Sequence, residues 1–272
     1  MEKLPPADVA FYAEHGYLAP IAVLTPEEAT RFRSCLERFE AEHPDRKELL
    51  RDKTHLALRW ADELIRHPRI LDAVEQILGP DILCWSSEFF IKDAQDRKFV
   101  SWHQDSTYWG LEPPEVLTAW VALTDSMSAN GAMRVIPGSH RIDQVPHRDT
   151  FAGDNLLSRG QEVALEMDES RAIALELQPG EMSLHHVRLI HGSEPNPSQR
   201  RRVGFAIRYL PTHVRQVVGQ RDSAMLVRGI DRFGHFLLEQ RPLADLDPEA
   251  LAYHARMHEE SAKIWMRGAR QR

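Results

Sequence analysis

The feature that most restricts the fold of this chain is a series of short apolar runs between residues 81 and 215, separated by turn-forming residues. Pro137-Gly138 and Pro179-Gly180 are two of these breaks. Many short strands without alternating helices favour an all-β barrel or a double-sheet roll over a parallel sheet. We therefore expect strands over residues 82–91, 99–104, 117–124, 132–136, 173–177, 181–186 and 203–210.

Helical patterns flank this β region on both sides. Thr25 is followed by a proline and two glutamates, which is the pattern of a capped helix start. A second helix is expected over residues 68–78, because Gly79-Pro80 ends the apolar pattern there. The segment 247–272 has helical spacing again.

The length of 272 residues fits one large domain or two small ones. We expect a single domain over residues 1–272 that is mainly β with flanking helices. Its parts are a mainly helical N-terminal part (1–80), a β core (81–215) and a partly helical C-terminal extension (216–272). Residues 141–172 interrupt the core without clear periodicity, and a long irregular insertion in a barrel is typical of a lid or binding loop.

His103-Gln104-Asp105 carries the first chemical signal, at the end of an expected strand. Residues i and i+2 of a strand point to the same side, so this tripeptide aims an imidazole and a carboxylate at one point. His191, which follows another apolar strand, is the candidate third ligand. Two histidines and one carboxylate on one face of a metal leave other positions open, which suits non-haem Fe(II) oxygenases.

Other histidines compete for the third position, since the chain contains 14 of them. His185 and His186 are adjacent in an expected strand, so at most one of them faces inward. His140 ends a turn and is expected to make a structural hydrogen bond. We favour His191 because the Gly192-Ser193 that follows it lets the chain approach a metal closely.

Strand parity gives the run 202–209 two different faces. The residues at 203, 205, 207 and 209 are large and apolar and suit packing against helices. The other face carries Arg202 and Arg208 at its ends, with small residues between them. An inward arginine without an anion costs several kcal/mol, so we assign Arg202 to a carboxylate of a co-substrate. Arg208 meets either a second anion, on the substrate, or a structural ion-pair partner.

At these residues the chain resembles the phytanoyl-CoA dioxygenase family of Fe(II)/2-oxoglutarate-dependent oxygenases. The resemblance covers about residues 5–215 and rests on Trp102–Asp105, on residues 130–140, on His191–Ser193 and on Arg202. It implies a double-stranded β-helix, a cupin-like jelly roll with flanking helices. It also implies that His103, Asp105 and His191 hold Fe(II), and that O2 and 2-oxoglutarate are co-substrates.

The resemblance further assigns residues around 2-oxoglutarate. It implies that Arg202 pairs with the distal carboxylate and that Ser193 helps to bind the same carboxylate. Trp120 matches a tryptophan that lines the co-substrate pocket. Lys53 matches a lysine that contacts 2-oxoglutarate in some members of the family.

The substrate pocket is expected on residues near the metal. Tyr108 and Trp109 follow the metal-binding strand and form one wall of the pocket, or else pack in the core. Phe90 and Lys92 have the same parity on a neighbouring strand and are expected to reach the same cavity. Lys92 together with Arg208 would suit an acidic substrate.

These inferences lead to one expected function and several alternatives. We expect a hydroxylase of a small molecule, with an acidic substrate as one option, that releases succinate and CO2. A cupin-like metal enzyme or a binding protein that does not use 2-oxoglutarate is an alternative, although it has no use for Arg202. A halogenase is disfavoured, because related halogenases replace the carboxylate ligand with a small residue and Asp105 is present here.

Composition limits the expected partners and location. The net charge of −7 and the lack of a basic run beyond residues 200–202 argue against nucleic acid. The chain has no apolar stretch of bilayer length and no apolar signal region at its start, so we expect no membrane contact. Cys35 and Cys84 are the only cysteines, which favours a reducing cytoplasm. The C-terminal helix is expected to pack on the barrel or to form homodimer contacts.

Overall fold

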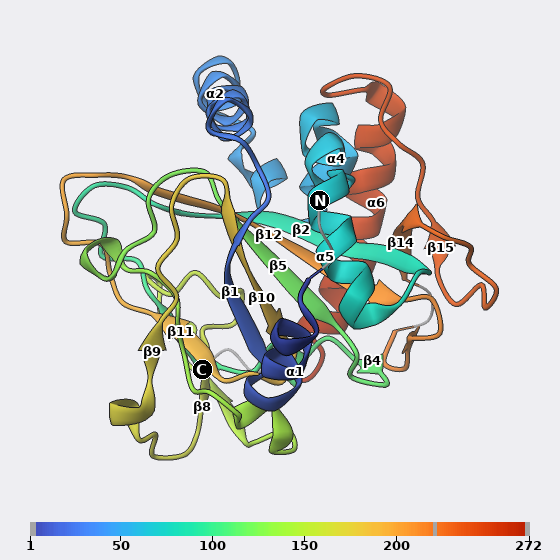
Figure 1. Ribbon diagram of the computed structural model, residues 1–272. Coiled ribbons are helices and arrows are strands. Elements are labelled where there is room, and N and C mark those ends of the chain that lie inside the picture. Colours follow the sequence, from blue (N-terminus) through green and yellow to red (C-terminus); the bar gives the residue numbers. More distant parts are fainter. Residues whose placement is uncertain (1–3, 220–221, 270–272) are drawn as a thin grey trace.

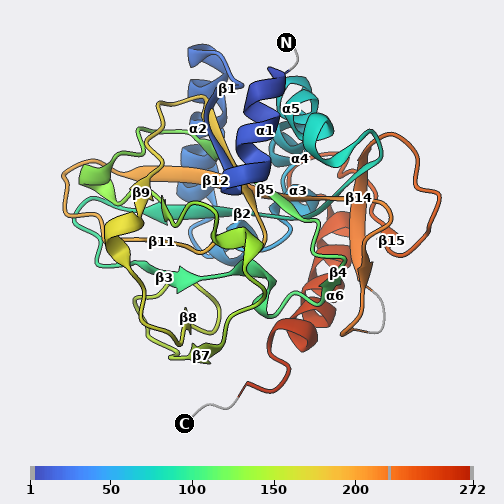
Figure 2. The same cartoon turned by 60° about the horizontal axis from the view of Figure 1, so that its bottom comes forward.

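The computed structural model describes residues 4–219 and 222–269. Within them, seven strands form a larger sheet in the order β1-β10-β5-β12-β2-β14-β15, and four form a smaller sheet in the order β3-β11-β6-β9. Figure 2 shows the smaller sheet below the larger one, so the two sheets face each other as in a jelly roll. The expected fold class, mainly β with flanking helices, is therefore confirmed.

The bounds of the elements agree broadly with the turn signals in the sequence. The strands are β1 (Tyr17–Ala22), β2 (Ile82–Lys92), β3 (Val100–His103), β4 (Leu111–Glu112), β5 (Leu117–Ala122), β6 (Arg134–Val135), β7 (His147–Asp149), β8 (Gln161–Val163), β9 (Ile173–Ala174), β10 (Glu181–His186), β11 (His191–Ser193), β12 (Arg202–Pro211), β13 (Arg215–Gln216), β14 (Ser223–Arg228) and β15 (Leu237–Leu238). The helices are α1 (Pro6–His15), α2 (Pro26–Glu42), α3 (Thr54–Ala57), α4 (Arg59–Ile65), α5 (Pro68–Leu78) and α6 (Pro248–Trp265). Among the described residues, no helix combines the length and the apolar character that a membrane span requires.

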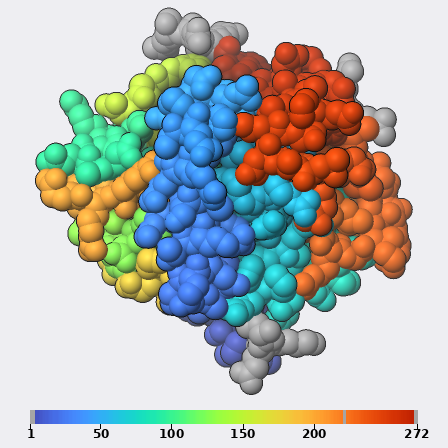
Figure 3. Space-filling view, turned by 90° about the horizontal axis from the view of Figure 1, so that it is seen from above, coloured from blue at the N-terminus to red at the C-terminus, as the bar shows by residue number. Residues whose placement is uncertain are grey.

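Helices cover the outer face of the larger sheet, as Figure 1 shows for α2, α4 and α5. The apolar face of β12 packs against this layer, because Val203, Phe205 and Ile207 are buried in one core with residues of α2, α4 and α5. The hydroxyl of Tyr209 donates a hydrogen bond of 2.7 Å to the carbonyl of Ile65 in α4. Figure 3 shows the N-terminal helical part beside the C-terminal extension on this side of the molecule. The alternation expected along β12 therefore leaves its other face for the interior of the roll.

The expected helix boundaries agree with the structure at several points. The hydroxyl of Thr25 accepts a hydrogen bond from the amide of Glu28 at 3.2 Å, and the Glu28 carboxylate accepts one from the amide of Thr25 at 2.7 Å. α5 has the expected bounds and is capped by Gly79. α6 ends at Trp265, before the expected end of the helix, and residues 270–272 lie outside the described part of the chain.

The sequence patterns missed three strands of the larger sheet. β1 lies in the part that was expected to be helical and pairs with β10. β14 and β15 lie in the C-terminal extension, where β14 pairs with β2 and β15 pairs with β14. β6 and β9 are shorter than expected, at two residues each. Pro137 contributes to the early end of β6, because proline has no amide hydrogen with which to extend a ladder.

The insertion between β6 and β9 contains a short hairpin of β7 and β8. Its Arg159 is buried and links three segments of the chain. The guanidinium forms an ion pair with Asp149 and lies 3.7 Å from the centroid of the Tyr108 ring. It also donates hydrogen bonds to the carbonyls of Trp265 and Arg267, at the end of α6, where a cation interacts favourably with the helix dipole. Arg159 therefore fastens the insertion to the C-terminal extension.

A buried ionic cluster joins α3 to the C-terminal extension. The ammonium of Lys53 lies 2.8 Å from Oε1 of Glu239, and Nε2 of His55 lies 2.9 Å from Oε2 of the same carboxylate. Lys53 also donates hydrogen bonds to the carbonyls of Trp85 and Ser223. An ammonium has three donors, so Lys53 has none left for 2-oxoglutarate, contrary to the expectation from the sequence.

We expect Glu239→Ala to destabilise the protein strongly. It leaves Lys53 and His55 buried without their carboxylate, and breaking a buried pair in this way costs about 3–5 kcal/mol. Glu63→Ala is the control, because Glu63 and its partner Arg31 are 40% and 53% exposed and such pairs contribute about 0–1 kcal/mol. Urea denaturation measures both free energies of unfolding, and equal losses would contradict the prediction.

The same carboxylate gives the wild-type protein a defined pH dependence. Burial raises the pKa of Glu239, but Lys53 and His55 outweigh burial and lower the pKa to about 2. A lowered carboxylate pKa stabilises the fold above its value in the unfolded chain, and this stabilisation is lost as the pH falls toward 2. The difference in stability between wild type and Glu239→Ala should therefore shrink in acid.

Candidate metal centre

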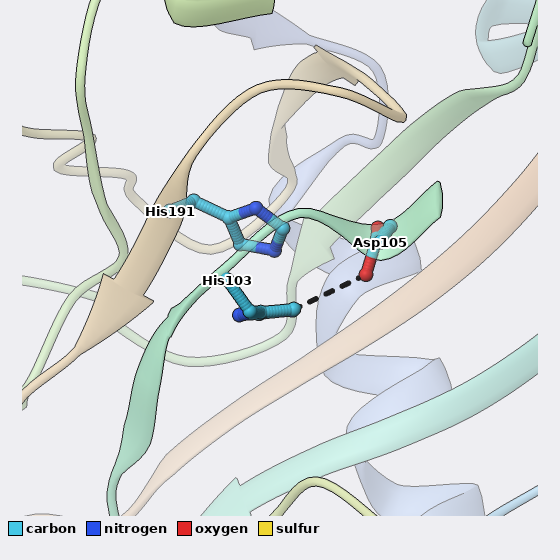
Figure 4. Close-up of side chains that lie close together, drawn as sticks. All are labelled: His103, Asp105 and His191. Atoms are coloured by element: carbon cyan, nitrogen blue, oxygen red, sulfur yellow. Dashed lines mark hydrogen bonds and ion pairs between the residues drawn. The ribbon is translucent and has the colours of Figure 1, made fainter. Parts of the chain in front are cut away.

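Three buried side chains converge between the two sheets. Figure 4 shows that His103, Asp105 and His191 point toward one another. One potential ligand atom of each lies within 4.8 Å of the others. Nε2 of His103 is 3.2 Å from Oδ1 of Asp105, and the centroids of the two imidazole rings are 4.1 Å apart. The structure therefore brings together the three ligands that the sequence predicted.

The positions of these side chains follow from strand pairing. β3 ends at His103 and Gln104 stays extended (φ −109°, ψ 131°), so Asp105 points to the same side as His103. His191 begins β11 and lies opposite His103 in the antiparallel register. A Cβ at Gly192 would lie 2.9 Å from a backbone oxygen of β3, so the glycine lets β11 approach β3 closely. A close approach of the chain to a metal at this glycine stays a prediction.

The surroundings prepare the three groups as metal ligands. Nδ1 of His103 lies 2.9 Å from the carbonyl of Ser101, and Nδ1 of His191 lies 2.9 Å from that of Leu189. These contacts leave each Nε2 for the centre. Burial, and then the nearby His103, lower the pKa of His191 to about 4. Burial raises the pKa of Asp105, but the two histidines outweigh it and hold that pKa below its usual range. Imidazole nitrogens and an ionised carboxylate on one face fit Fe(II).

A buried cation lines the same cavity. Arg202 is 2% exposed and donates a hydrogen bond to the carbonyl of Gly131. Burial lowers its pKa to about 10, so the guanidinium stays charged at neutral pH. In the described part of the chain, its Nε has no hydrogen-bond partner. The guanidinium lies 5.4 Å from the ring of Trp120, which fits against β12 because a Cβ at Gly204 would lie 1.8 Å from the indole.

Lys92 and Ser193 lie beside Arg202. Lys92 is opposite Arg202 in the register of β2 and β12. Its Nζ donates a hydrogen bond of 2.7 Å to Oγ of Ser193 and a second one to the carbonyl of Glu194. Burial, and then the charge of Arg202, lower the pKa of Lys92 to about 6. Lys92 was expected in the substrate pocket, but the structure places it at the Arg202 end and not among the residues that line the cavity at the three ligands.

The other predicted pocket residues lie near the three ligands. Phe90 and Arg208 line the same cavity as the ligands. Tyr108 and Trp109 lie in an adjoining cleft that shares Phe90 and Arg208 with it. Arg208 forms an ion pair of 2.5 Å with Glu88, which is the structural alternative left open by the sequence. Both Arg208 and Lys92 therefore have partners within the protein, although Nε of Arg208 has none among the described residues. An acidic substrate stays a prediction.

The sequence analysis assigned no role to His185, which also lines the cavity. Its ring centroid lies 4.8 Å from that of His191. The neighbouring His186 faces the other way and lies beside His140, which makes a hydrogen bond to a backbone carbonyl as expected. A signal for this arrangement was present in the sequence. The apolar residues at 182 and 184 face the helical core, so the odd positions of β10 face inward.

Comparisons with known proteins agree with this site. Residues 12–204 match the family model for phytanoyl-CoA dioxygenase (PhyH). A probable alpha-ketoglutarate-dependent hypophosphite dioxygenase of Stutzerimonas stutzeri is 32% identical over 177 residues, covering 63% of this chain and 61% of the relative. The peroxisomal phytanoyl-CoA dioxygenase of Homo sapiens is 27% identical over 216 residues, covering 70% of this chain and 63% of the relative. The chain therefore spans less than two thirds of the length of either relative.

Solved structures resemble the chain over most of its length. A non-heme monooxygenase, ThoJ in its apo form, has a TM-score of 0.84 at 37% identity and covers 94% of this chain and 96% of its own. CytC3 with Fe(II) and alpha-ketoglutarate has a TM-score of 0.68 at 25% identity and covers 90% of this chain and 96% of its own. The family model covers more than half of the residues, including the three predicted ligands and Arg202. The chain belongs to the phytanoyl-CoA dioxygenase (PhyH) family.

Proposed function

We propose that this chain is an Fe(II)- and 2-oxoglutarate-dependent dioxygenase that hydroxylates a small molecule and releases succinate and CO2. The observation that carries the proposal is a three-ligand face and a buried guanidinium in one cavity. When bound at His103, Asp105 and His191, Fe(II) supplies the redox chemistry that couples O2 and 2-oxoglutarate to hydroxylation. The protein itself orients the ligands, keeps them buried and needs no general base.

The co-substrate is held at its far end by the larger sheet. We assign Arg202 to the distal carboxylate of 2-oxoglutarate, because a planar guanidinium binds a carboxylate through paired hydrogen bonds. Ser193 and Lys92 lie next to it and add a hydroxyl and an amine to the same end. The ring of Trp120 lines this pocket and lies within cation–π distance of the guanidinium. Lys92 thus moves from the substrate pocket to the co-substrate pocket.

The substrate is proposed to enter the adjoining cleft, whose volume is about 420 Å³. Phe90, Tyr108 and Trp109 line one part of it, and Trp265 of α6 lines another. Two pairs of charged side chains in its walls are internal, Arg208 with Glu88, as above, and His258 with Asp52 at 3.0 Å, while Glu48 and Arg51 also line it. We propose a small molecule that is held mainly by the aromatic walls.

The alternatives fit the site less well. A metal enzyme or binding protein that ignores 2-oxoglutarate leaves the buried Arg202 without a function, and burying a charge without a partner is unfavourable. A halogenase needs an open position where Asp105 supplies a ligand.

Further features of the proposal concern organisation and location. We propose one oxygenase domain over residues 1–272, a cytoplasmic location and no binding of nucleic acid. The free thiols of Cys35 and Cys84 and the net charge of −7 support the last two. We also propose a homodimer through the C-terminal extension, which exposes Phe233 and Leu243 as single apolar side chains.

Activity and iron binding test the metal centre. Purified anaerobically with Fe(II) and 2-oxoglutarate, the protein should release succinate when its substrate is found in a metabolite screen. Asp105→Ala should lower iron affinity and hydroxylation by more than about a hundredfold, because even indirect partners of metal ligands contribute 10–100-fold. His213→Ala, at an exposed histidine that pairs with Glu115, should change neither. Full hydroxylation by Asp105→Ala, or a chlorinated product formed by the wild type in chloride, would contradict the assignment.

Substitutions of two neighbouring arginines test the co-substrate pocket. Arg202→Ala should raise KM for 2-oxoglutarate by about 10- to 100-fold, the value of a lost hydrogen bond to a charged group. Arg201→Ala is the matched control, because Arg201 is paired with Glu40 and Asp93 and is not among the residues that line the cavity. Its KM should stay at the wild-type value. Equal KM values for the two variants would exclude Arg202 as the carboxylate partner.

Lys92 should take up a proton when 2-oxoglutarate binds. With a pKa of about 6, Lys92 is largely neutral at pH 7.5 in the ligand-free protein. A carboxylate bound beside it favours the charged amine and raises that pKa, so binding of 2-oxoglutarate should take up close to one proton at pH 7.5 and fewer as the pH falls below 6. Calorimetry in buffers with different ionisation enthalpies measures this uptake. Lys92→Met should remove it, and an uptake that is unchanged in the variant would refute the prediction.

A further inference from the structure

Three polar side chains form a row across the larger sheet, in the strands that Figure 1 shows side by side. His185 of β10 lies opposite Thr118 of β5, and Thr118 lies opposite Arg208 of β12. Directly paired residues of antiparallel strands share one face of the sheet. All three side chains line the cavity that holds the predicted metal ligands.

Each member of this row has a hydrogen-bonding atom without a partner among the described residues, and for Arg208 this atom is Nε. His185 and Thr118 are each only 2% exposed. In the part of the chain that the structure describes, Nδ1 of His185 and Oγ1 of Thr118 have no hydrogen-bond partner. Buried polar atoms are rarely left unsatisfied, because neither water nor protein then replaces the lost hydrogen bonds. Two such atoms on facing residues, both lining one cavity, indicate a ligand that supplies their partners.

The position of the row indicates which part of a ligand it meets. The ring of His185 is 4.8 Å from that of His191, so the row lies close to the metal ligands. Thr118 and Trp120 are two residues apart on the same face of β5, a separation of about 6.6 Å. The guanidinium of Arg202 lies 5.4 Å from the centroid of the Trp120 ring. The row and Arg202 therefore lie at two ends of a stretch that a five-carbon dicarboxylate can span.

We propose that Thr118 and His185 bind the carboxylate of 2-oxoglutarate that lies nearest the metal. The hydroxyl of Thr118 and one N–H of His185 donate hydrogen bonds to it, while Arg202 binds the opposite carboxylate. The assignment rests on the proposed function and adds two residues to that site. His185 is not a fourth metal ligand, since the group of close ligand atoms among the described residues consists of the other three side chains.

The test follows the visible absorption band that Fe(II) forms with a chelating 2-oxo acid, under anaerobic conditions and without substrate. His185→Phe and Thr118→Val should each weaken 2-oxoglutarate binding by about tenfold, the effect of one lost hydrogen bond to a charged group. Both should also shift the band, because the hydrogen bonds act on a carboxylate bound to the metal. Thr118→Ser, which keeps the hydroxyl, should bind as the wild type does.

The matched control is His186→Phe, the same substitution at the adjacent histidine, whose ring faces away from the cavity. It should leave both the affinity and the band unchanged. Iron binding without 2-oxoglutarate should be unchanged in His185→Phe, and a loss there would overturn the assignment by making His185 a ligand. The assignment would also be overturned if His185→Phe and Thr118→Val both bound 2-oxoglutarate with the affinity of the wild type and showed the absorption band at its wild-type position. If the wild type forms no such band, the proposed function itself fails.

Discussion

The antiparallel pairing of β3 with β11 is the interaction on which the site depends. It sets His103 opposite His191, and the extended Gln104 carries Asp105 to the same side. A slip of one residue in this register would turn His191 to the opposite face of the smaller sheet. Gly192 resists such a slip, because its missing side chain is what lets the two backbones approach. The metal ligands are therefore fixed by backbone hydrogen bonds more than by contacts among the side chains.

The larger sheet provides the two basic side chains of the pocket, whereas the smaller sheet provides the predicted metal ligands. Arg202 and Lys92 are neighbours in the register of β12 and β2, and both are buried. Two adjacent cations in a medium of low dielectric repel each other strongly. Lys92 relieves this repulsion by releasing its proton near neutral pH, whereas Arg202 keeps its charge, because an arginine does not lose its proton in this pH range. The ligand-free pocket thus keeps one fixed charge and one amine that becomes charged when an anion arrives.

Strand parity accounts for most of what the sequence could predict. It separated the two faces of β12, placed Asp105 beside His103 and put one of two adjacent histidines inside. Parity says which face a residue occupies, but not how far along the strand it lies. Phe90 and Lys92 do share a face of β2, yet two residues of strand span about 6.6 Å. That distance moves Lys92 from the metal side of the cavity to the Arg202 side.

Contacts between distant segments were beyond the reach of local patterns. Lys53 is held by Glu239, which lies 186 residues away in the sequence, and nothing around Lys53 indicates that partner. β1 and β14 are strands because they extend the larger sheet beside β10 and β2. No strand was predicted from the residues of either segment. The metal ligands and Arg202 could therefore be predicted from the sequence, whereas the distant contacts that hold the surrounding sheet and helices in place could not.

The walls of the cleft come partly from segments outside the family match, and these segments contact the substrate in the proposed site. The family match ends at residue 204, but α6 begins at Pro248 and lines the cleft with Trp265. Arg159 fixes this helix to the insertion and stacks on Tyr108, so the insertion, the extension and the segment after β3 meet at one wall. The names of relatives that match only the core therefore say little about the substrate. The aromatic side chains at this wall and the charged Glu48 and Arg51, which also line the cleft, are the groups available to select a substrate.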